Sequence, residues 1–224
     1  MHDKQKIAII RLYSNLMRCN LVRRTKEDAL ATRSQLLDAA ERVFSERGVT
    51  HTSMAQVAEA AGVTRGAIYH HFSNKMALIE SLMERVRLPI DEMREQIAQQ
   101  PEFDALVEIQ ERTNEFLNRV ATDPRVQALA NILMHKCEYI DEVNPIKLRH
   151  LSGRNDCICD VEALFEKAVN EGQLPPQVSP RIAVIGLFGL VDGLIYNWLM
   201  DDGYFPLVEY GEAAINTYIN GLKA

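Results

Sequence analysis

The segment from Thr52 to Lys75, TSMAQVAEAAGVTRGAIYHHFSNK, carries side chains whose types and spacing suit binding to a nucleic acid. Arg65 can donate hydrogen bonds to a phosphate or to the edge of a base, and Tyr69 and His70 are further donors on the same stretch. Thr64 adds a hydroxyl beside the free N–H groups that begin a helix, where phosphate binds readily. The chemistry that these residues predict is DNA recognition.

Two short helices are needed to hold these side chains. Ser53, followed three residues later by Gln56, is the capping-box pattern of a helix start. Gly62 supplies the left-handed backbone of a sharp turn, and Thr64 caps the helix that follows it. Small residues between them let the two helices approach closely. One face of 64–71 therefore stays free to enter a major groove about 12 Å wide.

The residues that we predict to contact DNA lie in these helices, at their N-termini and in a preceding basic arm, and are Arg24, Thr52, Thr64, Arg65, Gly66, Tyr69, His70 and Lys75. The arm, Arg23 to Lys26, could follow the phosphate backbone or enter a minor groove. For Tyr69 the alternative is a packed ring with its hydroxyl outward. His71 and Phe72 are expected to pack in the interior instead of binding DNA.

Helical periodicity continues along the rest of the chain. Residues 32–47 are predicted to form one helix, capped by Thr32 with Gln35 and ended by Gly48. Further helices are expected at 75–87, 89–99, 103–121, 124–138, 146–171, 180–201 and 207–222. Ten segments thus show helical signals, and the expected fold is all-α with about nine helices. Its expected parts are an extension of uncertain origin at 1–22, disordered, a three-helix helix-turn-helix DNA-binding domain at 23–75, and a larger helical domain at 76–224.

Charge is distributed unevenly over these parts. The formal net charge is −6, and residues 1–22 carry 4 basic and 1 acidic side chains. Residues 23–75 carry 8 basic and 6 acidic side chains, whereas 76–224 carry 13 and 24. Only the N-terminal part can therefore lie comfortably against phosphate.

Other classes of site and location have little support. The four cysteines, at positions 19, 137, 157 and 159, lack the spacing of a disulfide framework or a zinc site, and we predict reduced thiols without metal or cofactor. Residues 182–200 are apolar over nearly a membrane-spanning length, but Asp192 and Asn197 interrupt them, which favours a buried helix or a subunit interface. The N-terminus lacks the apolar run of a signal peptide, so a cytoplasmic protein is expected.

Residues 23–80 resemble the DNA-binding domain of the TetR family of repressors. The stretches RRTKEDALATR and FSERGVTHTSMAQVAEAAGVTRGAIYHHFSNKMAL are similar to the start of AcrR- and TtgR-type repressors of multidrug-efflux operons. NILMHKCEYIDE (131–142) resembles the sixth helix of that subgroup, and GLVDGLIYNWL (189–199) resembles its eighth. The resemblance implies a homodimer that binds a pseudo-palindromic DNA operator, with ligand binding and dimerisation in the C-terminal domain.

The C-terminal half also has residues that suit a ligand site. Asn131 and His135 share one helix face, and Asp192 is a charge in the most apolar segment, which requires a partner, a cavity or an interface. A few polar groups in apolar surroundings are typical of sites for drug-sized molecules. The residues that the resemblance places around a lipophilic inducer (a drug, biocide or plant phenolic) are Asn131, His135, Phe188, Val191, Asp192 and Ile195. Alternatives are a hydrogen-bonded core role for His135, and for Asp192 an arginine partner or a dimer contact.

The resemblance further implies a dimer formed by the last two long helices. Glycines in the first of these helices permit close approach of a partner helix. The positions expected to face the partner are Gly186, Leu190, Gly193, Leu194, Asn197, Tyr210, Ala214 and Tyr218.

The sequence-based hypothesis is a ligand-responsive repressor that is neither an enzyme nor a membrane protein. One alternative is a DNA-binding regulator of the same fold that a protein partner controls, without a small-molecule inducer. Another is a helical enzyme that uses His135, Asp192 and Glu138, but the sequence has no nucleophile–base pair or metal-ligand spacing to support it.

Overall fold

The computed structural model describes residues 26–86, 103–137, 144–201 and 204–223. Over these ranges the regular structure is helical, as predicted, and comprises nine helices. They are the helix at 26–47, α2 (Met54–Ala60), α3 (Arg65–His71), α4 (Lys75–Glu84), α6 (Ala105–Thr122), α7 (Pro124–His135), α8 (Asn144–Asn170), α9 (Pro180–Met200) and α10 (Leu207–Leu222).

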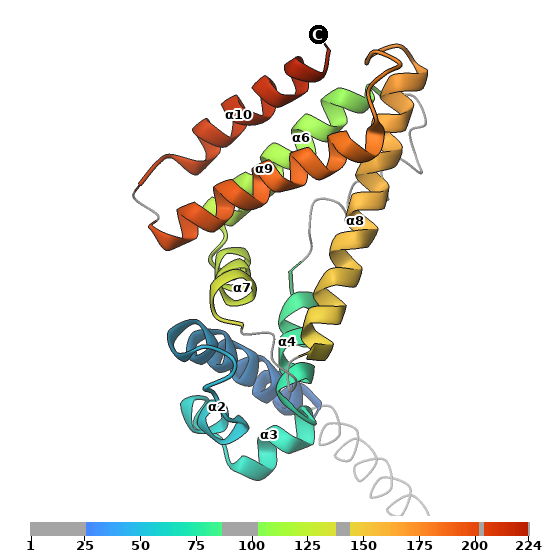
Figure 1. Cartoon of the computed structure of the whole chain (residues 1–224). Coiled ribbons are helices and arrows are strands. Elements are labelled where there is room, and N and C mark those ends of the chain that lie inside the picture. Colours follow the sequence, from blue (N-terminus) through green and yellow to red (C-terminus); the bar gives the residue numbers. More distant parts are fainter. Residues whose placement is uncertain (1–25, 87–102, 138–143, 202–203, 224) are drawn as a thin grey trace, which may run out of the picture.

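The first four helices form a small unit at one end of the molecule (Figure 1). Their apolar faces meet in a core that contains Leu36, Phe44, Val57, Ile68 and Leu78, each at most 2% exposed. Polar bonds at the edge of this core join the same helices. Arg42 donates to the Ala60 carbonyl of α2, and Arg33 donates to Ser81 of α4. The small unit therefore holds α3 firmly against the other three helices.

The larger unit consists of α6 to α10 (Figure 1). Helices α6, α9 and α10 pack on one another, and the long α8 runs along α9 and reaches α4 at its N-terminal end. Ile109, Leu117, Phe165, Val184 and Ile195 are at most 2% exposed in its core. Gly211 allows the close packing of α10 on α6, because a Cβ at this position would overlap the Leu117 side chain.

The local signals for helix starts and ends were mostly confirmed. Ser53 and Gln56 form the reciprocal capping box, and Thr64 accepts a hydrogen bond from the Ala67 N–H. Gly48 and Gly62 both adopt a positive φ, of 82° and 69°. The predicted cap at Thr32 was wrong. The helix already runs from residue 26, and the Thr32 hydroxyl donates to the Asp28 carbonyl within it.

Several predicted features lie outside the described residues. They are the extension at 1–22, the basic residues Arg23 and Arg24, the helix at 89–99, Cys19 and Glu138. The fourth helix ends at Glu84, one turn before the expected residue 87.

Helix α9 is long and apolar enough to cross a membrane, judged by length and composition within the described residues. Its charged side chains are Arg181 and Asp192. In the structure α9 lies between α8 and α10, and Ala183, Val184 and Leu187 are buried in the core. A core helix in a bundle passes the same test, so the composition alone is weak evidence for a membrane span.

Candidate nucleic-acid interface

Helices α2 and α3 are joined by a tight turn that determines how α3 is presented. The Val63 N–H donates to the Ala58 carbonyl at 2.9 Å, and Gly62 before it takes the left-handed conformation. Ala58 is 1% exposed, so only a small side chain fits where the two helices meet. Ile68 and Phe72 then bury the inner side of α3. The outer side is left facing solvent.

The outer face of α3 collects four of the predicted DNA-contacting residues: Arg65, Gly66, Tyr69 and His70, all of them exposed. The Arg65 guanidinium carbon lies 5.9 Å from the centre of the Tyr69 ring, so these two exposed side chains lie next to each other. Tyr69 is 47% exposed, so about half of its surface is open to a partner such as DNA.

His71 lies beside this face, and its ring contacts the His70 ring edge-on with centres 5.3 Å apart. It is half-buried, and its burial, together with the nearby His70 and Arg33, lowers its pKa. Phe72 is 2% exposed and lies under the Arg33 guanidinium. Phe72 thus packs in the interior as the sequence predicted, whereas His71 is only half-buried.

An open hollow of about 420 Å³ adjoins the outer face of α3. Thr50, Ser53, Tyr69, Asn74 and Lys75 are among the residues that line it. Ser53 caps α2 and Asn74 caps α4, so the N-terminal ends of two helices open near the hollow. Donor groups and helix ends at one concave surface suit an anion such as a DNA phosphate.

Thr52 and Lys75 have structural partners in the turn beneath this hollow. Thr52 is 2% exposed, and its hydroxyl donates to the Gly48 carbonyl at 2.7 Å. The Lys75 ammonium group donates to the carbonyls of Val49 and Thr50 at 3.1 and 3.4 Å. Both side chains satisfy carbonyl groups of a turn that has few backbone partners of its own, a requirement that residue spacing did not reveal.

The predicted ligand residues come from α7 and α9. Asn131 and Phe188 are half-buried, whereas Val191 and Ile195 are 7% and 0% exposed and belong to the core. Asp192 is exposed on one side, yet the apolar groups around its carboxyl raise its pKa, an effect that the Arg154 charge on α8 opposes. An arginine opposite Asp192 is one of the alternatives that the sequence left open.

His135 has a partner within the chain. Its Nε2 lies 3.1 Å from the Tyr196 carbonyl oxygen of α9, and the two rings contact each other at a tilt of 46° with their centres 4.3 Å apart. This contact supports the alternative in which His135 is a hydrogen-bonded residue of the core and does not bind a ligand. Tyr196 was not singled out from the sequence, and the apolar pattern of α9 offered no signal that its backbone would accept this bond.

The predicted dimer residues fall into two groups. Gly186 lies against the Tyr218 hydroxyl, which donates to Ala183, and Leu190, Gly193, Leu194 and Ala214 are half-buried. Asn197 and Tyr210 are exposed, and the Asn197 amide donates to the Gly193 carbonyl. The close approach at Gly186 is thus made between α9 and α10 of one chain.

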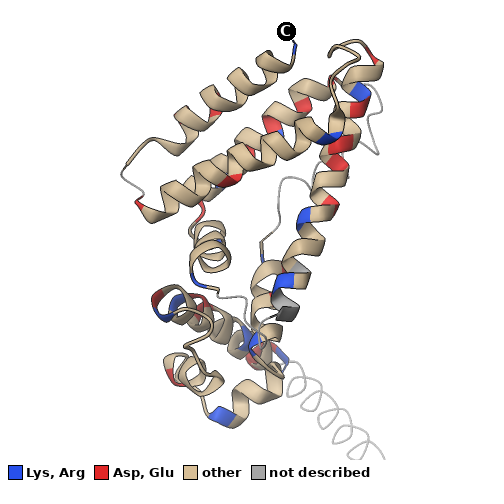
Figure 2. Ribbon diagram, in the orientation of Figure 1, with Lys and Arg blue, Asp and Glu red and all other residues tan. Residues whose placement is uncertain are grey.

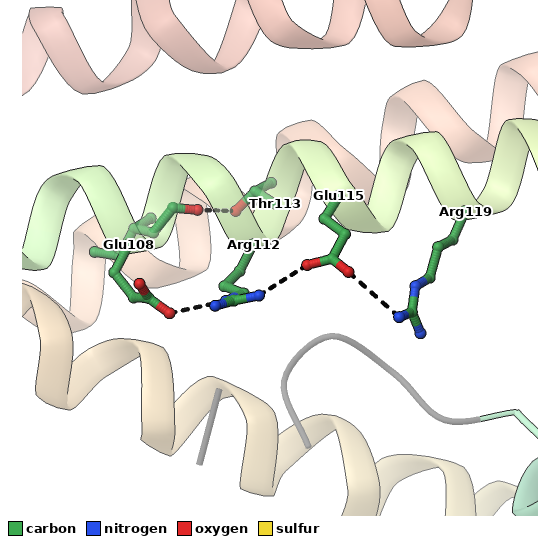
Figure 3. Close-up of polar contacts among 6 residues, drawn as sticks. Glu108, Arg112, Thr113, Glu115 and Arg119 are labelled. Carbon is green, nitrogen blue, oxygen red and sulfur yellow. Dashed lines mark hydrogen bonds and ion pairs between the residues drawn. The ribbon is translucent and has the colours of Figure 1, made fainter. Parts of the chain in front are cut away.

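A row of charged side chains on α6 was also missed. Glu108, Arg112, Glu115 and Arg119 alternate in sign along one face, and each is joined to the next by an ion pair of 2.8 to 3.3 Å (Figure 3). Burial alone would lower the pKa of Arg112, but hydrogen bonds to Glu108 and Glu115 outweigh it and raise that pKa. The three- and four-residue spacing was the available signal.

No group of three or more His, Cys, Asp or Glu side chains in the described part of the chain is placed to hold a metal ion. The candidate nucleic-acid interface is the outer face of α3 with the adjoining hollow.

Two family models match the chain. The model of bacterial regulatory proteins of the tetR family covers residues 36–82, and that of the C-terminal region of MAATS-type transcriptional repressors covers 104–224. The HTH-type transcriptional regulator TtgR of Pseudomonas putida is 39% identical over 203 residues, 91% of this chain and 97% of that protein. The chain belongs to the TetR family.

Solved structures of TetR-family repressors have the same fold. NalD, the secondary repressor of the MexAB-OprM multidrug efflux pump in Pseudomonas aeruginosa, superposes with a TM-score of 0.75 at 34% identity, covering 88% of this chain and 98% of NalD. SmeT in complex with triclosan gives a TM-score of 0.73 at 26% identity, covering 85% and 91%. SmeT represses the Stenotrophomonas maltophilia multidrug efflux pump SmeDEF.

Membership of the TetR family makes this protein a DNA-binding transcriptional repressor of a non-enzymatic family. The matched segment 36–82 contains α2, the turn and α3, so the family assignment and the exposed face of α3 concern the same surface.

Proposed function

We propose that this protein represses a multidrug-efflux operon in the cytoplasm and is released from its operator by a lipophilic aromatic compound. The observation that carries the DNA-binding part is the exposed face of α3, where Arg65, Tyr69 and His70 stand together beside the hollow. The efflux assignment is supported by the relatives: NalD and SmeT are repressors of multidrug efflux pumps.

The inducer class is supported by the larger domain and by SmeT, which binds triclosan. Asn131, Phe188, Asp192 and the core residues Val191 and Ile195 would line the site, with few polar groups among apolar ones. The ligand can release DNA only through a difference in its affinity for the DNA-bound and free states.

The test is operator binding with and without such compounds. The purified protein is titrated onto the intergenic DNA upstream of its own gene, at a stated salt concentration, in the presence of triclosan, other biocides and flavonoids. Specific binding that triclosan or another compound weakens supports the proposal. Specific binding that no compound affects would favour control by a protein partner, and absence of specific binding would contradict the operator assignment.

Two variants locate the DNA surface in the same assay. Tyr69→Ala and His70→Ala remove exposed side chains without disturbing the core, so the fold should be retained while operator binding falls by about 100-fold, the loss of one or two good contacts. Normal binding by both variants would show that this face of α3 does not enter the groove.

We further propose that the operator-binding form is a homodimer joined through α9 and α10. Ile182, Ile185 and Met200 of α9 are 74%, 48% and 68% exposed, and Tyr210 of α10 is 54% exposed, so both helices present large apolar side chains to solvent. Figure 2 shows how few charged residues these two helices carry. A two-fold dimer would place two copies of α3 about one turn of DNA apart.

Sedimentation of charged variants tests the dimer. Ile182→Glu should convert the dimer to a monomer, because a carboxylate buried in an apolar interface loses its hydration. Leu148→Glu is the matched control, since Leu148 is 63% exposed but lies on α8. Dimers of unchanged stability in Ile182→Glu would place the interface elsewhere.

A further inference from the structure

The C-terminal end of α7 belongs to the larger unit by chain position but packs into the small one. Ile132 is 0% exposed and lies in the same apolar core as the helix at 26–47, α3 and α4. Leu129, Leu133 and Cys137 pack against that core. Because protein cores are closely packed, the end of α7 cannot move away from the DNA-binding unit without opening it.

A backbone hydrogen bond ties the same end of α7 to the turn that precedes α2. The Val49 N–H donates to the Lys136 carbonyl at 2.8 Å. Gly48 brings this turn so close that a Cβ there would lie 3.3 Å from the same carbonyl oxygen. Lys75 of α4 donates to the Val49 carbonyl. The turn is therefore connected to α7 through its amide and to α4 through its carbonyl.

His135, the residue before Lys136, forms its contact with α9 and not with the DNA-binding unit. Its Nε2 lies 3.1 Å from the Tyr196 carbonyl of α9. A carbonyl oxygen only accepts, so Nε2 must carry the proton in this contact. Consecutive residues at the end of α7 thus connect two parts of the molecule, because His135 holds α9 while Lys136 holds the DNA-binding unit.

We propose that His135 is a positioning residue that couples α9 to the DNA-binding unit. Its bond to the Tyr196 carbonyl sets the position of the end of α7, and that end sets the turn at Val49 on which α2 and Lys75 depend. A shift of α9 against α7 must break the contact to Tyr196 or pull on the bond between Lys136 and Val49. The inference rests on the proposed function only in the experiment that uses an inducer, triclosan, as a probe.

The first measurement is hydrogen exchange of the Val49 amide in the full chain without ligand. His135→Phe keeps an aromatic ring beside Tyr196 but removes the donor. Exchange at Val49 should become about tenfold faster, the fold-change expected from losing one net hydrogen bond. His135→Gln, which keeps an N–H donor, should restore part of the protection. Unchanged exchange at Val49 in His135→Phe would overturn the proposal.

Two controls exclude a general loss of structure. Tyr196→Phe keeps the ring and the backbone carbonyl that accepts the bond, so exchange at Val49 should match the wild type. Amides in the core of α6, such as that of Leu117, should keep their protection in every variant. Faster exchange at Leu117 together with Val49 in both His135→Phe and His135→Gln would contradict a specific coupling role.

Operator binding with triclosan as probe separates coupling from a ligand contact. If His135 couples the two parts, His135→Phe weakens operator binding in the absence of triclosan. It also makes the operator affinity less sensitive to triclosan than it is in the wild type. For a simple ligand contact, the variant binds triclosan more weakly but keeps Val49 protected, which would overturn the proposal. If triclosan does not release the wild type, the inducer part of the proposed function fails, while the exchange result at Val49 still decides the role of His135.

Discussion

Gly48 and Gly62 have nearly the same backbone conformation but different surroundings, and this makes them a matched pair. Both have a positive φ, which costs a side-chain-bearing residue about 1–2 kcal/mol. A Cβ at Gly62 meets no atom within 4 Å, whereas at Gly48 it would lie 3.3 Å from the Lys136 carbonyl oxygen. We therefore predict that Gly48→Ala lowers the free energy of unfolding by more than Gly62→Ala, by about 1 kcal/mol of added crowding.

Urea denaturation of the two variants checks this difference. The slope of the unfolding free energy against urea should be unchanged, since the same surface is exposed in each case. Equal losses would mean that the Lys136 carbonyl moves aside freely, which would also weaken the argument for a firm contact between α7 and the turn.

Glu41 gives a prediction about pH. Burial raises the pKa of its carboxyl, the Arg85 charge opposes this, and the nearby Asp38 adds to it. A carboxyl whose pKa is raised on folding contributes stability that is present below its unfolded pKa and lost as the pH rises through the folded value. Glu41→Gln should therefore raise the melting temperature at pH 7, and this gain should shrink toward pH 4. A gain that is constant with pH would assign the effect to packing instead of ionisation.

At the scale of helices and turns, local residue chemistry was a good guide where the deciding contacts are local. Ser53, Thr64 and Gly62 were predicted in their observed roles because a cap or a left-handed turn depends on residues two to four positions away. The predicted cap at Thr32 was wrong because that prediction also used only neighbouring residues. Its pattern fits a cap, but the preceding residues also form helix, and nothing within four positions reports that.

The charged row on α6 should contribute most through Arg112, the less exposed of its two arginines. Arg112 pairs with both Glu108 and Glu115, and the side chains of Arg112 and Glu108 are 19% and 15% exposed. Arg112→Met leaves two half-buried carboxylates of like charge, so we expect a loss of about 1–2 kcal/mol in unfolding free energy. Arg119→Met, at the end of the row and more exposed, should cost below about 1 kcal/mol. Equal effects in thermal unfolding would show that the second partner and the lower exposure of Arg112 add nothing to its contribution.

At the scale of the whole molecule, the order of helices and the exposed face of α3 could be predicted, because periodicity and turn chemistry determine them. The contacts between the units could not. Ile132 has the spacing of any core residue of α7, and only the folded chain shows that it completes the core of the DNA-binding unit. The bond from His135 to the Tyr196 carbonyl is equally invisible, because every residue offers a backbone carbonyl and only the packing of α7 on α9 selects this one.

The uneven charge of the whole chain leads to a last prediction, about salt. Operator binding should weaken steeply with salt, by about 1,000-fold between 50 and 200 mM if six or more phosphates are contacted. The acidic larger domain should matter little, because screening limits the reach of a charge to about 8–10 Å. At about 0.1–0.15 M salt, Glu59→Gln on α2 should thus tighten operator binding, whereas Glu166→Gln on α8, also exposed, should leave it unchanged. Equal gains from both variants would mean that the charge of the larger domain also acts on DNA. The conclusion that only the N-terminal unit influences DNA binding would then be wrong.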